Sequence, residues 1–378
     1  MRTQNYIEKM KNIQANLLTF IDNEDNVEEN HQNLLKLFDD YKIRGDRYDL
    51  KSILHLLSKI VDNHYRCPNF FDKIFKILLN FKDQIKNYYT NSDIFDIFSN
   101  NKRIILFLIE EKMLTIDDQI ANILTSKEYN NEFYQQYLYN ELKPFLSEKV
   151  SQNISKLIPE DFEEKRKIGE NDKYICELIR KDNIDEFITF SNKNSLYLNS
   201  KIESSLFETN SYLLENKATL IEYAAFFGSI QIFRYLNLNG VKLTHSLWTY
   251  AIHGRNPEMI NYLEEKKVHP KESDYDICIN EAIKCHHNEI VNYIHSNILN
   301  INYPSLSNEL LSSAIECYNY NFFQNNFSDE SSLIKLCQND YFNLLINAIT
   351  DTNFNVNKRI ILFYFFLNPV LNLVFFFL

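Results

Sequence analysis

The chain has 378 residues and a formal net charge of −11, with 40 Lys and Arg against 51 Asp and Glu. This acidic balance argues against a general affinity for DNA or RNA, because a basic face supplies most of that binding. Only five glycines occur, and no two have the spacing of a P-loop or a dinucleotide fingerprint. With only seven prolines, the scarcity of glycine also argues against an all-β chain rich in tight turns.

The cysteines and the N-terminus indicate a reducing compartment. Six cysteines are scattered along the chain without a CxxC pair, and residues 1–10 are polar and lack the apolar stretch of a secretory signal. We therefore expect free thiols, mostly buried as small apolar residues, and a cytoplasmic protein.

Residues 1–165 predict a series of amphipathic helices. Apolar residues recur at helical spacing from Leu50 to Val61, and a second stripe runs from Phe71 to Leu79 after a break at residues 63–68. Further stripes follow at residues 94–98 and 104–109. Each helix has one apolar face that must pack against a neighbour, and the short connections favour antiparallel neighbours. This part is predicted to be an N-terminal helical domain.

Residues 166–357 contain an internal repeat. Four alanines serve as anchors at intervals of 27, 31 and 32 residues, and apolar residues follow them at offsets of eight, nine and twelve, although Asn326 breaks the last position of the fourth unit. Two further units begin at a leucine. The predicted repeat core consists of Leu178, Ala224, Ala251, Ala282, Ala314 and Leu336. Ile97 shows the same offsets, so the N-terminal part is interpreted as a possible diverged extension of the repeats.

The repeat predicts an all-α solenoid of stacked helix-turn-helix pairs. A small anchor lets the backbones of two crossing helices approach, and the later apolar positions form the buried face of the second helix. A single helix pair cannot bury both faces, so neighbouring pairs stack.

The segment TLIEYAA at residues 219–225, followed by Gly228, resembles the ankyrin-repeat signature. The N-terminal segments that begin at Asp49, Phe70 and Asn101 resemble an uncharacterised helical domain that precedes ankyrin repeats in expanded families of parasitic protists. The resemblance covers residues 45–357 and implies an ankyrin-like fold and protein binding, but it supplies no catalytic residues. The chain departs from the pattern where Leu220 replaces the usual proline, and residues 191–216 read as an insertion or a long loop.

In ankyrin-like arrays the concave face is built from positions two and three residues past each anchor. The expected partner-binding residues are therefore Arg180, Lys181, Phe226, Phe227, His253, Lys284 and Glu316. Phe226 and Phe227 could form an aromatic hot spot, since aromatic anchors dominate many interfaces. The alternative is that one of these two rings packs inward.

Metal binding and catalysis are the weaker interpretations. Five potential ligands fall within 18 residues, but their spacing matches no standard zinc site: Cys278, Cys285, His286, His287 and His295. We expect no metal, no cofactor and no enzymatic activity. An enzyme on this scaffold would need a deep pocket of titratable groups with perturbed pKa values.

The C-terminal tail, residues 358–378, contains 19 nearly continuous apolar residues from Ile360 to Leu378, which reaches the length needed to span a bilayer. Asn368, Pro369 and Asn372 interrupt it, and polar groups at that depth are costly. A membrane anchor, a truncated last repeat and a reading-frame artefact therefore stay open. The function we expect is a scaffold that binds an unknown protein partner, with a membrane-tethered form as the alternative.

Overall fold

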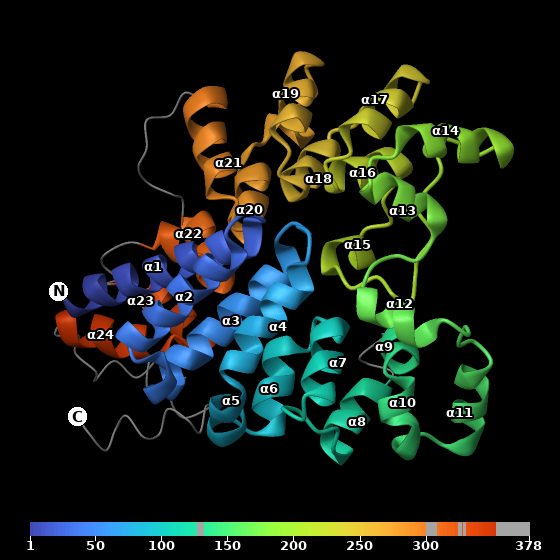
Figure 1. The fold of residues 1–378 in the computed structure, drawn as a ribbon. Helices are drawn as coiled ribbons and strands as arrows, with labels where there is room; N and C mark the ends of the chain where they lie inside the picture. Colours follow the sequence, from blue (N-terminus) through green and yellow to red (C-terminus); the bar gives the residue numbers. More distant parts are fainter. Residues whose placement is uncertain (127–131, 300–307, 324–326, 328–329, 353–378) are drawn as a thin grey trace. The chain divides into compact units, whose positions relative to one another are not determined.

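The computed structural model describes residues 1–126, 132–299, 308–323, 327 and 330–352 (Figure 1). The regular elements of these residues are all helices, and one isolated β-bridge joins Lys201 to Thr219. The predicted all-α class is therefore confirmed for the described part of the chain. Its two compact units are residues 1–57, 67–73 and 299–378, and residues 58–66 and 74–298, so they do not follow the sequence boundary at residue 165.

The first unit combines the two ends of the described chain. Its N-terminal elements are α1 (Arg2–Asp22), α2 (Val27–Asp40), η1 (Ile43–Gly45) and the start of α3 (Arg47–Asn63). Its C-terminal elements are α22 (Asn308–Glu316), η5 (Tyr320–Phe322), α23 (Glu330–Gln338) and α24 (Phe342–Thr352). Helix α1 packs on α2, α24 and η5. The buried amide of Gln14 donates to Asn319 Oδ1 at 2.9 Å and accepts from the backbone N–H of Tyr320 at 2.8 Å, which ties α1 to the C-terminal helices.

The second unit begins with short helices of the predicted N-terminal domain. They are most of α4 (Phe70–Asn80), α5 (Lys82–Tyr88), α6 (Asn91–Phe98), α7 (Lys102–Glu110), α8 (Asp118–Thr125), α9 (Glu132–Tyr137), α10 (Tyr139–Leu142), η2 (Lys143–Phe145), α11 (Glu148–Ser155) and α12 (Phe162–Ile168). Thr90 opens α6 with a reciprocal capping box to Asp93. The stripes read from the sequence all lie on helices, and the predicted break before Pro68 separates α3 from α4.

Four helix pairs complete the second unit. They are α13 (Tyr174–Arg180) with α14 (Ile184–Lys193), α16 (Leu220–Phe226) with α17 (Ile230–Leu238), α18 (Leu247–Gly254) with α19 (Pro257–Glu265), and α20 (Asp276–Lys284) with α21 (Asn288–Tyr293). The short helix α15 (Ser211–Glu215) precedes α16, η3 (Lys271–Ser273) precedes α20, and the π-helical turn η4 (Ile294–Ile298) follows α21. The first helices pack in chain order, α13 on α16, α16 on α18 and α18 on α20, as Figure 1 shows.

The same left-handed turn follows every anchor of the repeat. The residue four positions past the anchor has a positive φ in all six units, with values of 48° to 67°: Asp182, Gly228, Arg255, His286, Tyr318 and Asp340. Its backbone N–H donates to the carbonyl one residue past the anchor, and in five units the next N–H donates to the anchor carbonyl itself. These paired bonds form a Schellman motif, which ends one helix and reverses the chain into the next.

The anchors lie in the interior, as the packing argument requires. All six are at most 2% exposed. Two details differ from the sequence pattern. After Ala314 the expected second helix is reduced, within the described residues, to the 3₁₀ turn η5. Ile97 is not followed by a left-handed turn, because Asn101 has a φ of −123° and serves as an ordinary N-cap for α7.

Polar contacts join neighbouring helix pairs at the same register. The side chain five positions past an anchor hydrogen-bonds to the carbonyl one position past the preceding anchor in three units. These bonds are Ser229 Oγ to Ile179 O, His287 Nδ1 to Ile252 O and Tyr341 Oη to Ile315 O. The carboxylate of Asp182 also caps α17 by accepting from the N–H groups of Gln231 and Ile232, at 3.0 Å each. The turns therefore both reverse the chain and connect one pair to the next.

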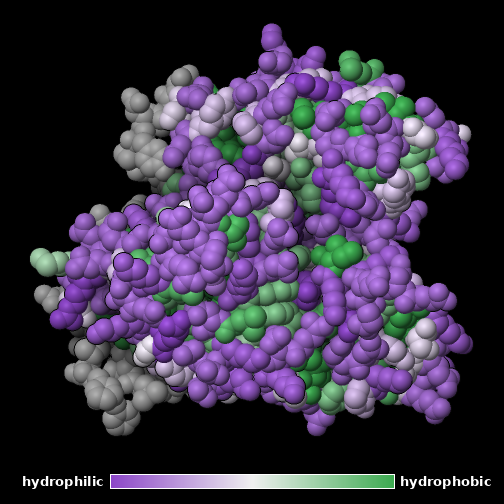
Figure 2. All heavy atoms as spheres, viewed as in Figure 1, coloured by the Kyte–Doolittle hydropathy of each residue, from purple (hydrophilic) through white to green (hydrophobic). Residues whose placement is uncertain are grey.

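Trp248, three residues before the anchor Ala251, lies in the core. The side chain of Trp248 is fully buried, and its indole N–H donates to the carbonyl of Val268 at 2.8 Å. In the view of Figure 2 most of the surface belongs to hydrophilic residues. Among the described helices none is long and apolar enough to cross a bilayer. The C-terminal tail, residues 358–378, with its apolar stretch Ile360–Leu378, lies outside the described residues.

The packing of α18 on α16 depends on Gly254. A Cβ atom at this position would lie 2.4 Å from the carbonyl oxygen of Ala225 and 2.9 Å from the backbone nitrogen of Gly228. We expect Gly254→Ala to lower the free energy of unfolding by about 1–3 kcal/mol, because backbone atoms must move apart to admit the methyl group. Chemical denaturation of the full chain measures this change.

Gly45→Ala is the matched control for that substitution. A Cβ at Gly45 meets nothing within 4 Å, and its φ lies outside the left-handed region. It should leave the free energy of unfolding within about 0.5 kcal/mol of the parent, as surface substitutions do. Equal effects of the two substitutions would contradict the close approach of α16 and α18.

Candidate functional site

The structure divides the residues predicted to bind a partner. Phe226 is 2% exposed and His253 is fully buried, so neither side chain can contact a partner at the surface. This corrects the expectation drawn from their positions two residues past an anchor. For the aromatic pair, the alternative in which one ring packs inward applies, because Phe226 is buried and Phe227 is half-buried.

The remaining predicted contacts stay accessible to different degrees. Lys181 is exposed and pairs with Glu177 on its own helix at 2.6 Å, and Lys284 is 39% exposed. Arg180 is only 14% exposed, because its guanidinium binds Glu170 at 2.7 Å and the hydroxyl of Tyr223 at 3.0 Å. Glu316 is exposed but belongs to the other compact unit. The predicted partner-binding residues that remain accessible on the second unit are therefore Lys181, Phe227 and Lys284.

Helix α15 forms the first cover over the predicted partner-binding face. The ring of Tyr212 lies 4.3 Å from the ring of His253 and stacks on Phe226 at 6.1 Å, measured between ring centroids. Its hydroxyl donates to Thr249 Oγ1 at 2.8 Å, which fixes the ring over α18. Tyr212 lies in the segment 191–216 that the repeat pattern treats as an insertion. No periodicity in the sequence indicates that this insertion folds back over the repeat.

The end of α3 and the residue pair that follows it form a second cover. The backbone carbonyl of Asn63 accepts from His253 Nδ1 at 3.2 Å, and His64 Nδ1 donates to the carbonyl of Cys285 at 2.6 Å. The ring of Tyr65 lies 5.6 Å from the guanidinium carbon of Arg255. These contacts join residues about 190 to 220 positions apart, and all of them lie within the second unit.

A buried ion pair lies beneath this cover. His253 Nε2 lies 2.8 Å from Glu281 Oε1, and the opposite nitrogen faces the Asn63 carbonyl. Each ring nitrogen of His253 thus lies against an oxygen acceptor. Burial raises the pKa of Glu281, but the hydrogen bond and charge of His253, together with Lys284, lower it by more, so this pKa lies below its usual value. The pair links α18 to α20.

His253, Glu281 and Cys285 bring three potential metal ligands within 4.8 Å of one another. Imidazole, carboxylate and thiolate are all zinc ligands. The geometry does not suit a metal, however. Cys285 Sγ lies 3.4 Å from Nδ1 and 3.9 Å from Nε2, which places the sulfur beside the ring and off the lone-pair direction of either nitrogen. Both nitrogens already face acceptors, so the three residues are better explained as a hydrogen-bonded group.

His287 is a second buried imidazole in this region. Its Nδ1 donates to the carbonyl of Ile252 at 2.9 Å, and its ring lies 4.9 Å from that of His64 in an edge-on contact. Burial lowers the pKa of His287 well below 6.5, and its electrostatic interactions with His64 and Arg255 lower it further. The ring is therefore neutral in the folded protein at pH 7.

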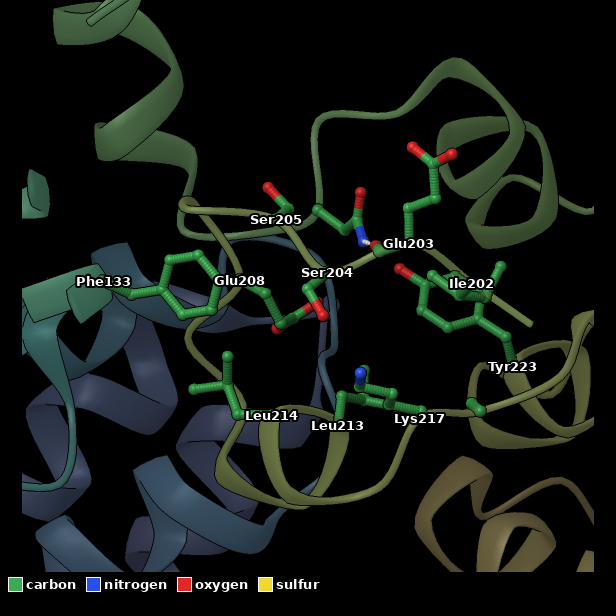
Figure 3. Close-up of a pocket in the computed structure, with 12 residues that line it drawn as sticks. Phe133, Ile202, Glu203, Ser204, Ser205, Glu208, Leu213, Leu214, Lys217 and Tyr223 are labelled. Atoms are coloured by element: carbon green, nitrogen blue, oxygen red, sulfur yellow. Dashed lines mark hydrogen bonds between the residues drawn. The ribbon is translucent and has the colours of Figure 1, made fainter. Parts of the chain in front are cut away.

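The pocket in Figure 3 tests whether the second unit holds a site for catalysis. Among the residues that line it, Glu208 is buried, and burial raises the pKa of its carboxyl group. Its Oε1 accepts from the N–H groups of Thr209 and Asn210, while Oε2 has no hydrogen-bond partner in the structure. Burial also lowers the pKa of the nearby Lys102 to about 7, although its ammonium group donates to the carbonyl of Leu206.

This pocket is too small for a substrate. Its volume is about 40 Å³, which is room for roughly three water molecules. Lys102 and Glu208 instead hold the loop before α15 in place, since both bind its backbone. Perturbed pKa values mark active sites and structural ion networks alike. Here the backbone contacts favour the structural interpretation.

Comparisons of the chain with models of protein families, with curated proteins and with solved structures find no match. The geometry described above is therefore what carries the functional proposal. Its main elements are the repeated turn, the accessible residues beside it and the two covers over α18 and α20.

The neutral state of His287 makes stability depend on pH. In the unfolded chain this histidine binds a proton near its ordinary pKa of 6.5, whereas the folded protein resists protonation. The unfolded state thus binds more protons below pH 6.5, so stability is full above this value and falls as the pH decreases. We expect His287 to contribute a loss of up to about 1.4 kcal/mol for each pH unit below 6.5.

His287→Asn is the variant that isolates this contribution. Asn256 occupies the equivalent position in the preceding repeat and donates through its amide to the carbonyl of Gly228, so asparagine suits the turn. The free energy of unfolding, measured by chemical denaturation from pH 7.5 to 5.0, should fall less steeply in the variant. Parallel curves for the parent and His287→Asn would show that His287 does not titrate in this range.

Proposed function

We propose that the chain is an ankyrin-like scaffold that binds another protein through the accessible edge of its repeat array. The observation that carries this proposal is the left-handed turn four residues past all six anchors, with the same paired backbone bonds in five of them. A regular stack of short helix pairs presents the same positions at each step, and extended binding surfaces of repeat proteins arise in this way. The net charge of −11 favours a protein partner over a nucleic acid.

The proposed contact surface is smaller than the repeat pattern alone suggests. It consists of Lys181 at the end of α13, Phe227 after α16 and Lys284 at the end of α20. A half-buried aromatic ring between two lysines suits an acidic partner segment with an apolar residue. The proposal includes no metal, no cofactor and no catalytic step.

An apolar pocket on the second helices extends the surface that a partner could use. It has a volume of about 390 Å³ and is lined by Ile260, Ile290 and Tyr293, with Arg255 and Glu289 at its rim. Arg255, in the turn after α18, forms an ion pair with Glu289 on α21. A pocket of this size accepts an apolar side chain of a bound protein.

The test compares partner capture by the full chain and by a surface variant. The variant carries Lys181→Glu, Phe227→Ala and Lys284→Glu, and the control carries Lys149→Glu and Leu157→Ala, both at exposed positions on or after α11. Proteins retained from cell lysate are identified and quantified by mass spectrometry. We expect a partner that the parent and the control retain and that the surface variant loses by at least about tenfold, as for hot-spot residues.

The melting temperature of each variant shows whether the array has stayed folded. A partner retained equally by all three folded proteins would exclude this surface as the binding site. A partner lost by both variants would indicate a general effect of charge and not a located contact.

A further inference from the structure

Residues Asp62–Tyr65 lie across the predicted binding face as a peptide ligand would; we call this segment the strap. Most of its polar contacts use the backbone. The carbonyl of Asp62 accepts from Ser211 Oγ at 3.3 Å, and the carbonyl of Asn63 accepts from His253. His64 donates to the carbonyl of Cys285, and Tyr65 lies against Arg255 and His287. The strap therefore uses the helix ends and turns that carry the predicted concave positions.

The strap covers one thiol in particular. Cys285 is fully buried although it lies three residues past its anchor, a position expected on the open face. Its carbonyl is bound by His64, and its sulfur lies against the His253 ring that the strap also holds. Cys278 is equally buried but lies two turns earlier on α20. The two cysteines thus report on different events, since only Cys285 depends on the strap.

The strap also contains a feature that opposes its closed position. The carboxyl group of Asp62 is buried, and its Oδ1 has no hydrogen-bond partner in the structure. Burial raises the pKa of this carboxyl group to about 6. A buried polar atom without a partner is destabilising, and opening the strap would return it to water. The strap ends in the connection between α3 and α4, and connections of this kind open more readily than helices.

We propose that the strap is an intramolecular ligand that occupies the face formed by His253, Arg255, Cys285 and His287, and that a partner segment must displace it to bind there. The displacing segment would present a backbone carbonyl to His253 and an aromatic ring to Arg255 and His287. This inference rests on the proposed scaffold function and adds its regulation. A scaffold with a closed strap binds at the exposed edge only, and one with an open strap binds along the face.

Site-resolved thiol labelling of the full chain tests the proposal. The parent, Tyr65→Ala and the double variant His64→Ala with Tyr65→Ala are treated with iodoacetamide at pH 7.5, and each cysteine is quantified by peptide mass spectrometry. We expect the labelling rate of Cys285 to rise at least about tenfold in the double variant and by less in Tyr65→Ala, since a 1.4 kcal/mol weakening of the cover is tenfold. Cys278 and Cys176, which the strap does not contact, should keep the parent's rates.

A peptide of residues 58–69 carrying Cys67→Ser supplies the strap in trans. Added in excess to either open variant, it should restore the protection of Cys285. An unchanged rate at Cys285 in both variants would overturn the proposal, and so would an equal rise at Cys278, which indicates unfolding of α20. Failure of the peptide to restore protection would show that the substitutions damage the face itself, and this too would overturn it.

The labelling outcome is independent of the partner experiment. If Cys285 responds as expected but no partner depends on Lys181, Phe227 and Lys284, the strap exists and the scaffold proposal fails. If a partner depends on those residues while Cys285 never responds, the scaffold stands and the strap is a fixed part of the fold.

Discussion

The left-handed residue after each anchor is the constraint on which the repeat depends, because two helices can meet at a small anchor only if the chain reverses at once. Glycine accepts a positive φ freely, yet only Gly228 among the six positions is a glycine. At the other five the strain is of order 1 kcal/mol each. At four of these five positions the side chain makes a contact that glycine could not make. Asp182 caps the next helix pair, and Asp340 binds Lys51 at 3.0 Å and His55 at 3.4 Å.

Those contacts also have electrostatic consequences. Although burial opposes ionisation of Asp340, its bonds to His55 and Lys51 outweigh it and lower the pKa of the carboxyl group to about 2. Arg255 uses the same turn position to reach Glu289, and Tyr318 uses it to stack on Tyr341. The contacts of these side chains thus give a physical reason why the turn positions depart from glycine. At Asp182, Arg255, Tyr318 and Asp340 the departure from glycine replaces conformational freedom with a specific contact to a neighbouring element.

The periodic part of the fold could be predicted from the sequence because it depends on local spacing. The six anchors, the apolar positions of the second helices and the buried Trp248 follow from residues within one unit of each other. The burial of His253 could not be predicted in this way. It depends on Tyr212 in a non-periodic insertion and on Asn63, 190 residues earlier in the chain, and spacing carries no information about either contact. The residue types at the predicted concave positions gave a weak signal of burial, because a histidine and a cysteine are unusual on a solvent-exposed face.

Burying His253, His287 and Glu281 beneath the strap costs desolvation free energy that apolar side chains in the same place would avoid. An apolar filling of the same space would stabilise the array at least as well, because buried ion pairs rarely exceed the stability of well-packed apolar groups. Polar groups under a cover keep a different property: once exposed, they can form hydrogen bonds and ion pairs with another chain. Asn63 and His64 satisfy His253 and Cys285 with the same backbone and imidazole chemistry that any peptide segment carries. The polar groups of this face can form hydrogen bonds with a peptide segment, and in the structure the strap supplies that segment. Such a face is better adapted to exchange of the strap for another segment than to permanent closure.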